Sequence, residues 1–440
     1  MVGRRRPLVD RRRCRRRPGA RRGLRRRLTR GHGPARPRVA LGAMSRRSPL
    51  LPLLSSVLLL GIADSMIGPY LVLFGADEAH LSPLQVGIFL SLVAVSGLVA
   101  STWLGRRYDR SPSRWPTFVA VAAPAAGYLA LTTTTAYPLL LLVGVGLLGA
   151  GMAAFPQVFT LARTHLDRRG EAAVRRGTPA LRSVWSLAWA IGPIVGAAVL
   201  SAGAYDRLML LTACAFALVA VPVVLLGRTP GRSREAVPPP EQGRLPRPML
   251  FAAASFTLFH TAMLAGSVVL PLYVTRTLQQ PETGVGVLFS VCALVEVPAA
   301  LATMMLPARS PTRTFILLGM LLFAVYFVLV SASTTMPMLI ATQVVRGVAI
   351  AVVGALGITY VQDLAPGATG RATALYANTL TIGSLVSGVL AGATAQALGY
   401  RPALLVCAFV AALGFVLLAV ARHGAARVPR IGLSWRDAPY

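Results

Sequence analysis

The sequence contains no lysine, and only 13% of its 440 residues are charged. Soluble domains carry roughly 25% charged residues, so this composition excludes an ordinary soluble domain. Every basic residue is arginine, and the net charge is +31. We interpret this exclusive use of arginine as a bias of GC-rich coding, so the charge alone does not predict a partner that is a nucleic acid.

Cysteine is also scarce, and its placement excludes several kinds of site. The four cysteines are Cys14, Cys214, Cys292 and Cys407, and none belongs to a CxxC or CxxH pattern. We therefore predict no disulfides and no metal site. The sequence has no phosphate-binding Gly-x-x-x-x-Gly-Lys loop and no nucleophile elbow. We therefore expect no enzymatic activity, no ATP-driven transport and no cofactor.

The first 43 residues hold 17 arginines among glycines and prolines and cannot build a core. We predict a disordered tail over residues 1–48. One interpretation is that translation begins at Met44 and that the preceding segment is not translated. The alternative is an arm that binds nucleic acid or anionic lipid.

Long apolar runs fill the rest of the chain, at the roughly 20-residue length that crosses a bilayer. A segment in lipid must satisfy its own backbone, so each run predicts a helix. Thr178 and Pro179 predict the N-cap and first residue of the fifth helix. We expect two six-helix halves at 49–227 and 248–422, a linker at 228–247 and a tail at 423–440. The twelve predicted segments are 49–74, 84–104, 115–134, 137–162, 181–203, 207–227, 248–275, 284–306, 314–333, 337–361, 371–397 and 400–420.

The arginines predict the orientation of these helices. With the N-terminus in the cytoplasm and residues 1–43 left out, the cytoplasmic segments hold 24 arginines and the external loops 3. Cytoplasmic loops of membrane proteins carry the excess of basic residues. We therefore predict that both termini lie in the cytoplasm.

One short basic turn occurs twice, after the second and the eighth apolar segment. Residues 105–114 read Gly-Arg-Arg-Tyr-Asp-Arg-Ser-Pro-Ser-Arg, and 308–313 read Ala-Arg-Ser-Pro-Thr-Arg. A turn repeated at the same place in two halves indicates an internal duplication. The two arginines and the Ser-Pro pair align, whereas Asp109 corresponds to Ala308.

Two six-helix halves with this turn resemble the major facilitator superfamily of secondary transporters. The resemblance implies an all-α membrane protein of twelve transmembrane helices in two halves. It implies that Asp109 latches the halves beside the start of the eleventh helix, where an anion is stabilised; a solvated turn charge is the alternative. The matching turn residues are expected to act in gating: Gly105, Asp109, Arg110 and Arg114.

The segment Ala188-Trp-Ala-Ile-Gly192-Pro193-Ile-Val-Gly196-Ala197 is similar to the antiporter motif of that superfamily, which marks export. Ordinary packing of small residues is the alternative. Further stretches resemble the bacterial sugar efflux transporter family, which exports sugars and their glycosides in exchange for protons. These stretches are 155–163, 182–193, 294–298, 362–367 and 375–380.

Ionisable residues inside the membrane are costly and mark functional sites. Glu296 and Asp64 are therefore candidates for proton coupling, with a structural buried carboxyl as the alternative. Arg346 is expected to pair inside the second half, because arginine does not lose its proton. Arg163 and Arg182 either reach the membrane surface or form a gate with Asp363.

A sugar site requires paired hydrogen-bonding groups and flat apolar faces. The candidates for substrate binding are Gln157, Trp189, His260, Tyr376, Asn378 and Gln362. For His260, a histidine that is simply hydrogen-bonded in the core is the alternative. We therefore predict a monomeric exporter of a small-molecule substrate, a sugar or glycoside, by proton antiport with alternating access in the inner-membrane bilayer. Export of drugs or other small metabolites is the runner-up, and a membrane-tethered nucleic-acid binder is the remaining alternative.

Overall fold

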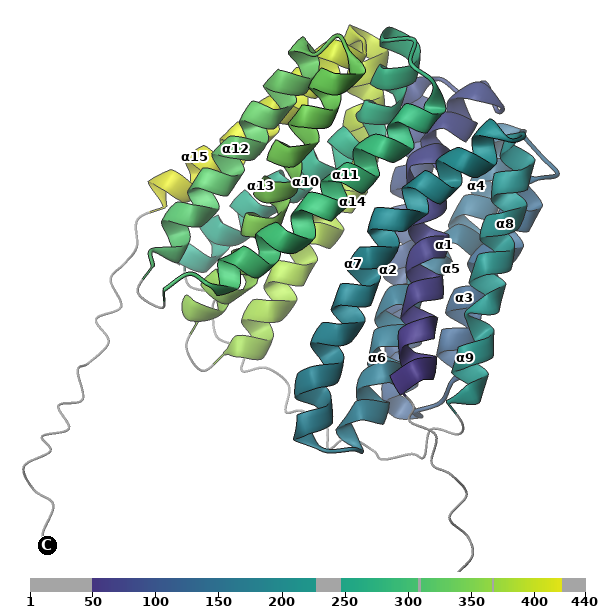
Figure 1. Ribbon diagram of the computed structural model, residues 1–440, viewed down its shortest axis with the longest axis vertical. Helices are drawn as coiled ribbons and strands as arrows, with labels where there is room; N and C mark the ends of the chain where they lie inside the picture. The colour runs from purple at the N-terminus through teal and green to yellow at the C-terminus, as the bar shows by residue number, and fades with distance from the viewer. Residues whose placement is uncertain (1–49, 227–246, 308–309, 366–367, 422–440) are drawn as a thin grey trace, which may run out of the picture. The chain divides into compact units, whose positions relative to one another are not determined.

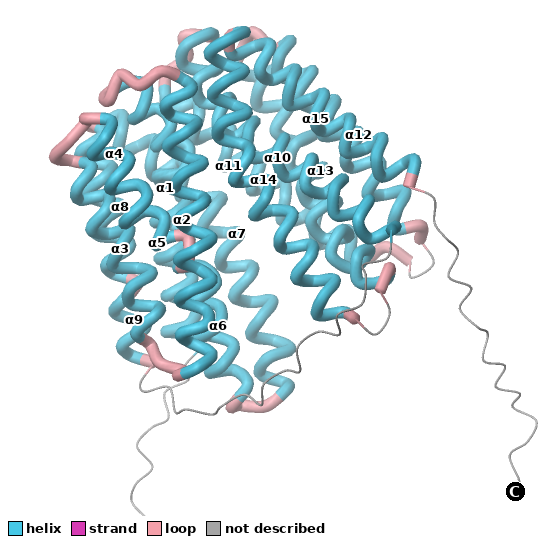
Figure 2. The backbone as a smooth tube through the Cα atoms, turned by 180° about the vertical axis from the view of Figure 1, so that it is seen from behind, coloured by secondary structure: helices cyan, strands magenta, loops and turns pink. Residues whose placement is uncertain are grey.

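The computed structural model describes residues 50–226, 247–307, 310–365 and 368–421. Within these ranges every regular element is a helix (Figure 2). The predicted N-terminal tail, linker and C-terminal tail lie outside the described residues, as does Ala308 of the second turn. Residues 48–440 belong to one unit, and the description below concerns the described part of that unit.

Six spans form the N-terminal half. Eleven helices of the described chain are long and apolar enough to cross a membrane, and the shorter Trp115–Leu131 completes twelve spans. The fourth span, Tyr137–Asp167, is built from four consecutive pieces, and the sixth from two. The elements are α1 (Leu50–Asp77), α2 (Pro83–Arg110), α3 (Trp115–Leu131), α4 (Tyr137–Val143), η1 (Gly144–Leu148), α5 (Gly149–Gly151), α6 (Ala154–Asp167), α7 (Glu171–Ser201), α8 (Tyr205–Leu218) and α9 (Ala220–Leu225).

Six further spans form the C-terminal half, drawn from teal to yellow in Figure 1. The π-helical segment η2 extends the first of them beyond Pro271. The elements are α10 (Arg247–Leu272), η2 (Tyr273–Thr277), α11 (Glu282–Met304), α12 (Thr312–Ala332), α13 (Met336–Asp363), α14 (Thr369–Leu398) and α15 (Tyr400–Val420). The predicted twelve-helix fold in two halves is confirmed.

Local sequence explains several helix ends. The Ser82 hydroxyl accepts from the backbone N–H of Gln85, and the Gln85 side chain accepts from the Ser82 N–H, so α2 begins with a capping box. Gly399 separates α14 from α15 with a φ of 89°, a conformation that glycine adopts without steric cost.

The predicted start of the fifth helix was wrong. Residues Thr178 and Pro179 lie inside α7, which begins at Glu171. The first turns of α7 carry Glu171 and Arg176, both exposed. The helix therefore continues beyond the apolar segment, and hydropathy alone placed its beginning too late.

The two halves meet mainly along two helix pairs, α7 with α11 and α2 with α14, and α1 also contacts α10 and α11. Small residues permit this close approach. A methyl group at Gly87 of α2 would collide with the Gly388 carbonyl of α14, and one at Gly286 of α11 would collide with Tyr70 and Pro193. We call the end of the bundle where α1 finishes and α11 begins the Asp77 end, and the opposite end the Asp109 end.

Candidate functional site

Four aromatic rings from two helices of the N-terminal half form the first part of the site. Phe155 lies 4.4 Å from Phe159 on α6 and 4.6 Å from Trp185 on α7, between ring centroids. Trp185 lies 6.4 Å from Trp189, one helical turn further along α7. The Trp189 indole N–H has no hydrogen-bond acceptor within the described residues. This aromatic cluster offers flat apolar faces beside an unused donor.

Asp64 of α1 lies next to this cluster. Gly61 contacts Trp185 and Ala188, and Gly68 approaches Trp189 at 4.0 Å from its ideal Cβ position. Residues spaced by three and four share one face of a helix, so Asp64 lies on the face of α1 that α7 borders. Its side chain is exposed. The predicted carboxyl therefore lies on the same face of α1 as the glycines that approach Trp185 and Trp189.

The C-terminal half contributes a second group around Tyr376 of α14. The Tyr376 ring lies 5.2 Å from Phe256 and 5.7 Å from His260, both of α10. His260 is buried, and its Nδ1 lies 3.0 Å from the Thr379 hydroxyl. Asn378, on the same helix, is exposed. His260 is thus a hydrogen-bonded histidine beside Tyr376, whereas Asn378 is exposed.

Arg346 of α13 is held entirely by the C-terminal half. Its guanidinium donates to the Ser267 hydroxyl at 2.8 Å and to Gln343 Oε1 at 3.4 Å. Its Cζ lies 4.8 Å from the Phe289 ring centroid and 5.9 Å from that of Tyr326. Cation–π contacts are strongest where water is excluded, and Arg346 is only 5% exposed.

Glu296 of α11 forms no ion pair among the described residues. The charges of Arg182 and Arg346 both act on its carboxyl. Arg182 belongs to α7 of the opposite half, and its charge also acts on Tyr376. Glu296 is half-buried. The carboxyl is therefore available to a proton or to a substrate.

Two predicted substrate residues have other surroundings. Gln157 is 3% exposed inside the N-terminal half, on the face of α6 opposite the aromatic cluster, and its Oε1 has no donor within the described chain. Gln362 donates to the Thr373 hydroxyl at 2.8 Å, which ties α13 to α14. Neither side chain lies beside the aromatic cluster.

The predicted gating residues divide between the two halves at the Asp109 end. Asp109 and Arg110 are exposed at the end of α2, and a methyl group at Gly105 would meet only open space. Within the described residues, no hydrogen bond or ion pair joins Asp109 to α14, and none joins Arg163 or Arg182 to Asp363. The expected gate contacts are therefore not made in this conformation.

Arg114 has a different role from its neighbours in the turn. Its guanidinium donates to the carbonyls of Val223 and Val224, in the last turn of α9, at 3.4 and 2.9 Å. A cation at a helix C-terminus is favourable because the final carbonyls lack partners. Arg114 therefore joins the turn to the last span of its own half.

The antiporter motif lies at a three-helix contact. A methyl group at Gly192 would collide with Ser65, and one at Gly196 with the Met66 carbonyl, both of α1. The Pro193 carbonyl accepts from the Tyr70 hydroxyl at 2.9 Å. The other side of α7 receives α11 at Gly286. The motif thus packs α1 against α7 where the two halves meet.

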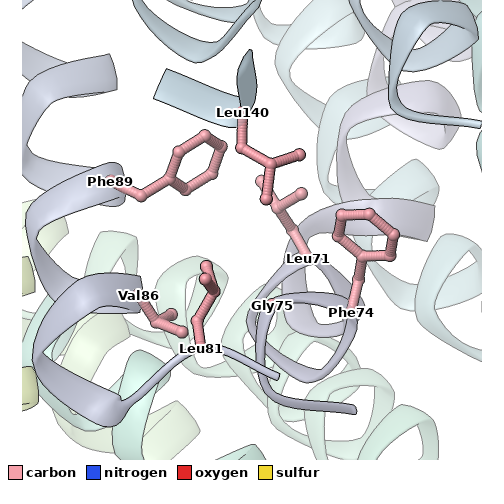
Figure 3. A pocket seen from close by; sticks show the side chains of 7 residues that line it. All are labelled: Leu71, Phe74, Gly75, Leu81, Val86, Phe89 and Leu140. Atoms are coloured by element: carbon pink, nitrogen blue, oxygen red, sulfur yellow. The ribbon is translucent and has the colours of Figure 1, made fainter. Parts of the chain in front are cut away.

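Two pockets of the described chain lie away from this site, and the larger, of about 380 Å³, lies at the start of α10 and the end of α15, beside Arg247, Phe251 and Val420. An apolar pocket of about 10 Å³ lies between α1, α2 and α4, too small for a sugar (Figure 3). Its lining carries no polar side chain: Leu71, Phe74, Gly75, Leu81, Val86, Phe89 and Leu140. No group of three or more metal-ligating side chains occurs in the part of the chain that the structure describes.

Twelve apolar helices in two halves form the architecture of a secondary transporter. The family model "Major Facilitator Superfamily" matches residues 8–178 and 250–437, so the chain belongs to this superfamily. Its curated relatives are sugar efflux transporters. A Deinococcus radiodurans protein named as a sugar efflux transporter is 40% identical over 84% of this chain and 98% of its own length. Sugar efflux transporter A of Dickeya chrysanthemi is 32% identical over 78% of this chain and 88% of its own length.

Solved structures support the fold alone. A mutant of the nucleoside transporter NupG has a TM-score of 0.74 at 14% identity, over 85% of this chain and all of that chain. A bacterial homologue of the lysosomal transporter Spinster, in an inward-facing and occupied conformation, has a TM-score of 0.66 at 14% identity, over 84% of this chain and 96% of that one.

Proposed function

We propose that the protein exports a sugar or glycoside by proton antiport with alternating access. The observation that carries the proposal is that α7, which bears Trp185, Trp189 and Arg182, packs against α11 of the C-terminal half, the half that supplies the polar groups Glu296 and Tyr376. A substrate between the halves would meet the aromatic cluster on one side and these polar groups on the other. The relatives named as sugar efflux transporters support a sugar as the substrate.

Alternating access is supported by where the halves are joined. Five polar contacts between the halves lie at the Asp77 end: Leu84 N–H to Gln396, Val389 N–H to Ser91, Tyr205 to Glu282, Arg276 to Asp77, and Arg276 to the Ala76 carbonyl. Asp109 lies roughly 33 Å along α2 from Gly87, at the opposite end. We infer that this conformation is closed at the Asp77 end and open at the Asp109 end, and that rocking of the halves reverses this arrangement.

The arginine-rich segments identify the Asp109 end as cytoplasmic in this proposal, with both termini on that side. An opening to the cytoplasm suits an exporter that waits for its substrate. The proton would bind at Glu296, with Asp64 as the second carboxyl of the site. We propose that the transporter acts as a monomer, because each half supplies part of one site.

The aromatic cluster also favours a second candidate function, export of an amphiphilic drug or other metabolite with an apolar group. Everted membrane vesicles separate the two. When the lumen of the vesicles is made more acidic than the medium, labelled glycosides should accumulate in the lumen. Unlabelled sugars should compete with this uptake. Accumulation of apolar cations without competition by sugars would instead establish the drug exporter, and a lack of any gradient-driven uptake would refute both.

A further inference from the structure

A tyrosine shared by two carboxyl groups joins the halves at the Asp77 end. The Tyr205 hydroxyl, at the start of α8, lies 3.0 Å from Asp77 Oδ2 and 2.8 Å from Glu282 Oε1. Asp77 ends α1 in the N-terminal half, whereas Glu282 begins α11 in the C-terminal half. Arg276 of η2 pairs with Asp77 and donates to the Ala76 carbonyl at 3.2 Å. We call these four residues, Asp77, Tyr205, Arg276 and Glu282, the Tyr205 clasp.

The number of hydrogens in the Tyr205 clasp is decisive. A tyrosine hydroxyl carries one hydrogen, so it donates to one of its two neighbours and can only accept from the other. Arg276 holds Asp77 in its ionised form through their ion pair, which makes Asp77 the natural acceptor. The 2.8 Å contact with Glu282 is then attractive only when the Glu282 carboxyl carries a proton and donates it to the tyrosine oxygen.

The surrounding charges favour that proton. The negative charges of Asp77 and of Glu78, just after α1, both act on the Glu282 carboxyl. Tyr70 of α1 faces Glu282 as a neutral phenol, and Tyr400 of α15 faces Arg276 and Asp77. Arg276 is the cation of this group, and it is engaged by Asp77. Like charges close together disfavour a second ionised carboxyl.

We propose that Glu282 binds a proton within the Tyr205 clasp and that this proton stabilises the closed Asp77 end. The inference rests on the proposed function for the side of the membrane on which the proton binds. If the Asp77 end faces the exterior, an acidic exterior closes that end. The carrier would then return to the state that accepts substrate from the cytoplasm. This proton regulates the gate and is distinct from the one assigned to Glu296.

Distances between spin labels test the proposal without any substrate. The labels are placed at exposed Ser201 of α7 and Leu398 of α14, at the Asp77 end of opposite halves, in protein reconstituted into lipid nanodiscs. Cys14 and the exposed Cys214 are first replaced by serine. The short-distance population should grow as the pH falls from about 8 to about 5, by up to roughly tenfold per pH unit for one linked proton.

Variants identify the group that responds. Glu282→Gln has an amide that donates as the protonated carboxyl does, so it should stay closed at every pH. Tyr205→Phe should populate the open form throughout and lose the pH response. Asp206→Asn, which removes an exposed acid beside Tyr205 on α8, is the matched control and should respond as the wild type does.

A wild-type distance distribution that is independent of pH would overturn the proposal. An unchanged pH response in Glu282→Gln would overturn it as well. Failure of sugar export has no bearing on these distances and would refute only the proposed function. A pH-dependent clasp in a protein that exports no sugar would therefore leave this inference standing.

Discussion

Arg114 and Arg313 make the same contact in the two halves of the protein. Arg114 donates to the Val223 and Val224 carbonyls in the last turn of α9, and Arg313 donates to the Leu418, Ala419 and Ala421 carbonyls at the end of α15, at 2.8 to 3.1 Å. Both arginines close the repeated basic turn. The duplication visible in the sequence thus has a structural purpose, which is to tie each turn to the final span of its half.

Replacing either arginine should therefore destabilise its own half. Arg114→Gln and Arg313→Gln each remove a cation from unpaired helix carbonyls, at a cost of about 1–2 kcal/mol. Thermal unfolding in detergent should show midpoints several degrees lower for both. Arg110→Gln, in the same turn but exposed, is the control and should unfold as the wild type does. Equal midpoints for all three variants would contradict the assigned role.

Asp109→Asn should change the balance of open states. In the proposed cycle the carboxylate stabilises the start of α14 when the Asp109 end closes, by about 0.3–1 kcal/mol if exposed and up to about 2 if partly buried. Removing the charge should favour the conformation described here, which is open at that end. Cysteine-accessibility labelling on both sides measures the ratio, and an unchanged ratio would leave Asp109 as a solvated turn charge.

Glu296→Gln should uncouple transport from the pH gradient. Glutamine keeps the size and hydrogen bonding of the side chain but cannot take up and release a proton. Proteoliposomes should lose gradient-driven efflux and still exchange labelled for unlabelled substrate. Full gradient-driven efflux would transfer the coupling role to Asp64. Loss of both activities would make Glu296 a binding or structural residue.

Gly388→Ala should prevent closure of the Asp77 end. The added methyl group would lie 2.5 Å from the Gly87 carbonyl oxygen and 2.6 Å from the Ser91 hydroxyl, so α2 and α14 must separate. Residues at the Asp77 end should then label faster with a membrane-impermeant thiol reagent. Gly354→Ala is the matched control, because a methyl group there meets open space. Equal labelling of the two variants would contradict the close contact between the halves.

Trp189→Leu should weaken substrate binding without uncoupling transport. The indole offers a stacking face next to Asp64, and aromatic contacts of this kind contribute about 0.5–1.5 kcal/mol beyond the burial of area. The KM for an aryl glycoside should therefore rise by up to roughly tenfold, with the gradient dependence unchanged. An unaltered KM would place the substrate away from α7.

The spans were predictable from the sequence because a bilayer requires long apolar helices, and the described helices follow the predicted segments except at the start of α7, which begins at Glu171 and not at residue 181. The site was predictable only in part. Hydropathy does not tell which face of α6 looks inward: Gln157, predicted as a ligand, is buried inside the half, whereas Phe155 and Phe159 pack edge-to-face against Trp185. Charge alone identified Arg346 and Glu296, because both are rare inside a membrane.

The Tyr205 clasp could not be recognised from sequence order. Its members stand at helix ends, where isolated charges are ordinarily solvated, and they come from four separate elements. Only the pairing of α1, α8, η2 and α11 brings them together. The sequence does place Asp77 and Glu282 at the same end of the bundle, the one that is poor in arginine. It does not show that the two side chains share a hydrogen-bond partner.

The surroundings of Arg346 bear on how this chain enters the membrane during synthesis. Its contacts are with Ser267 on α10, Phe289 on α11, Tyr326 on α12 and Gln343 on α13 itself. Each of these residues precedes Arg346 in the chain. When the ribosome delivers α13, the three earlier spans that solvate its guanidinium have already been made. We therefore expect that the C-terminal half can be assembled in the order in which it is translated, with Arg346 entering a protein environment that its partners already form.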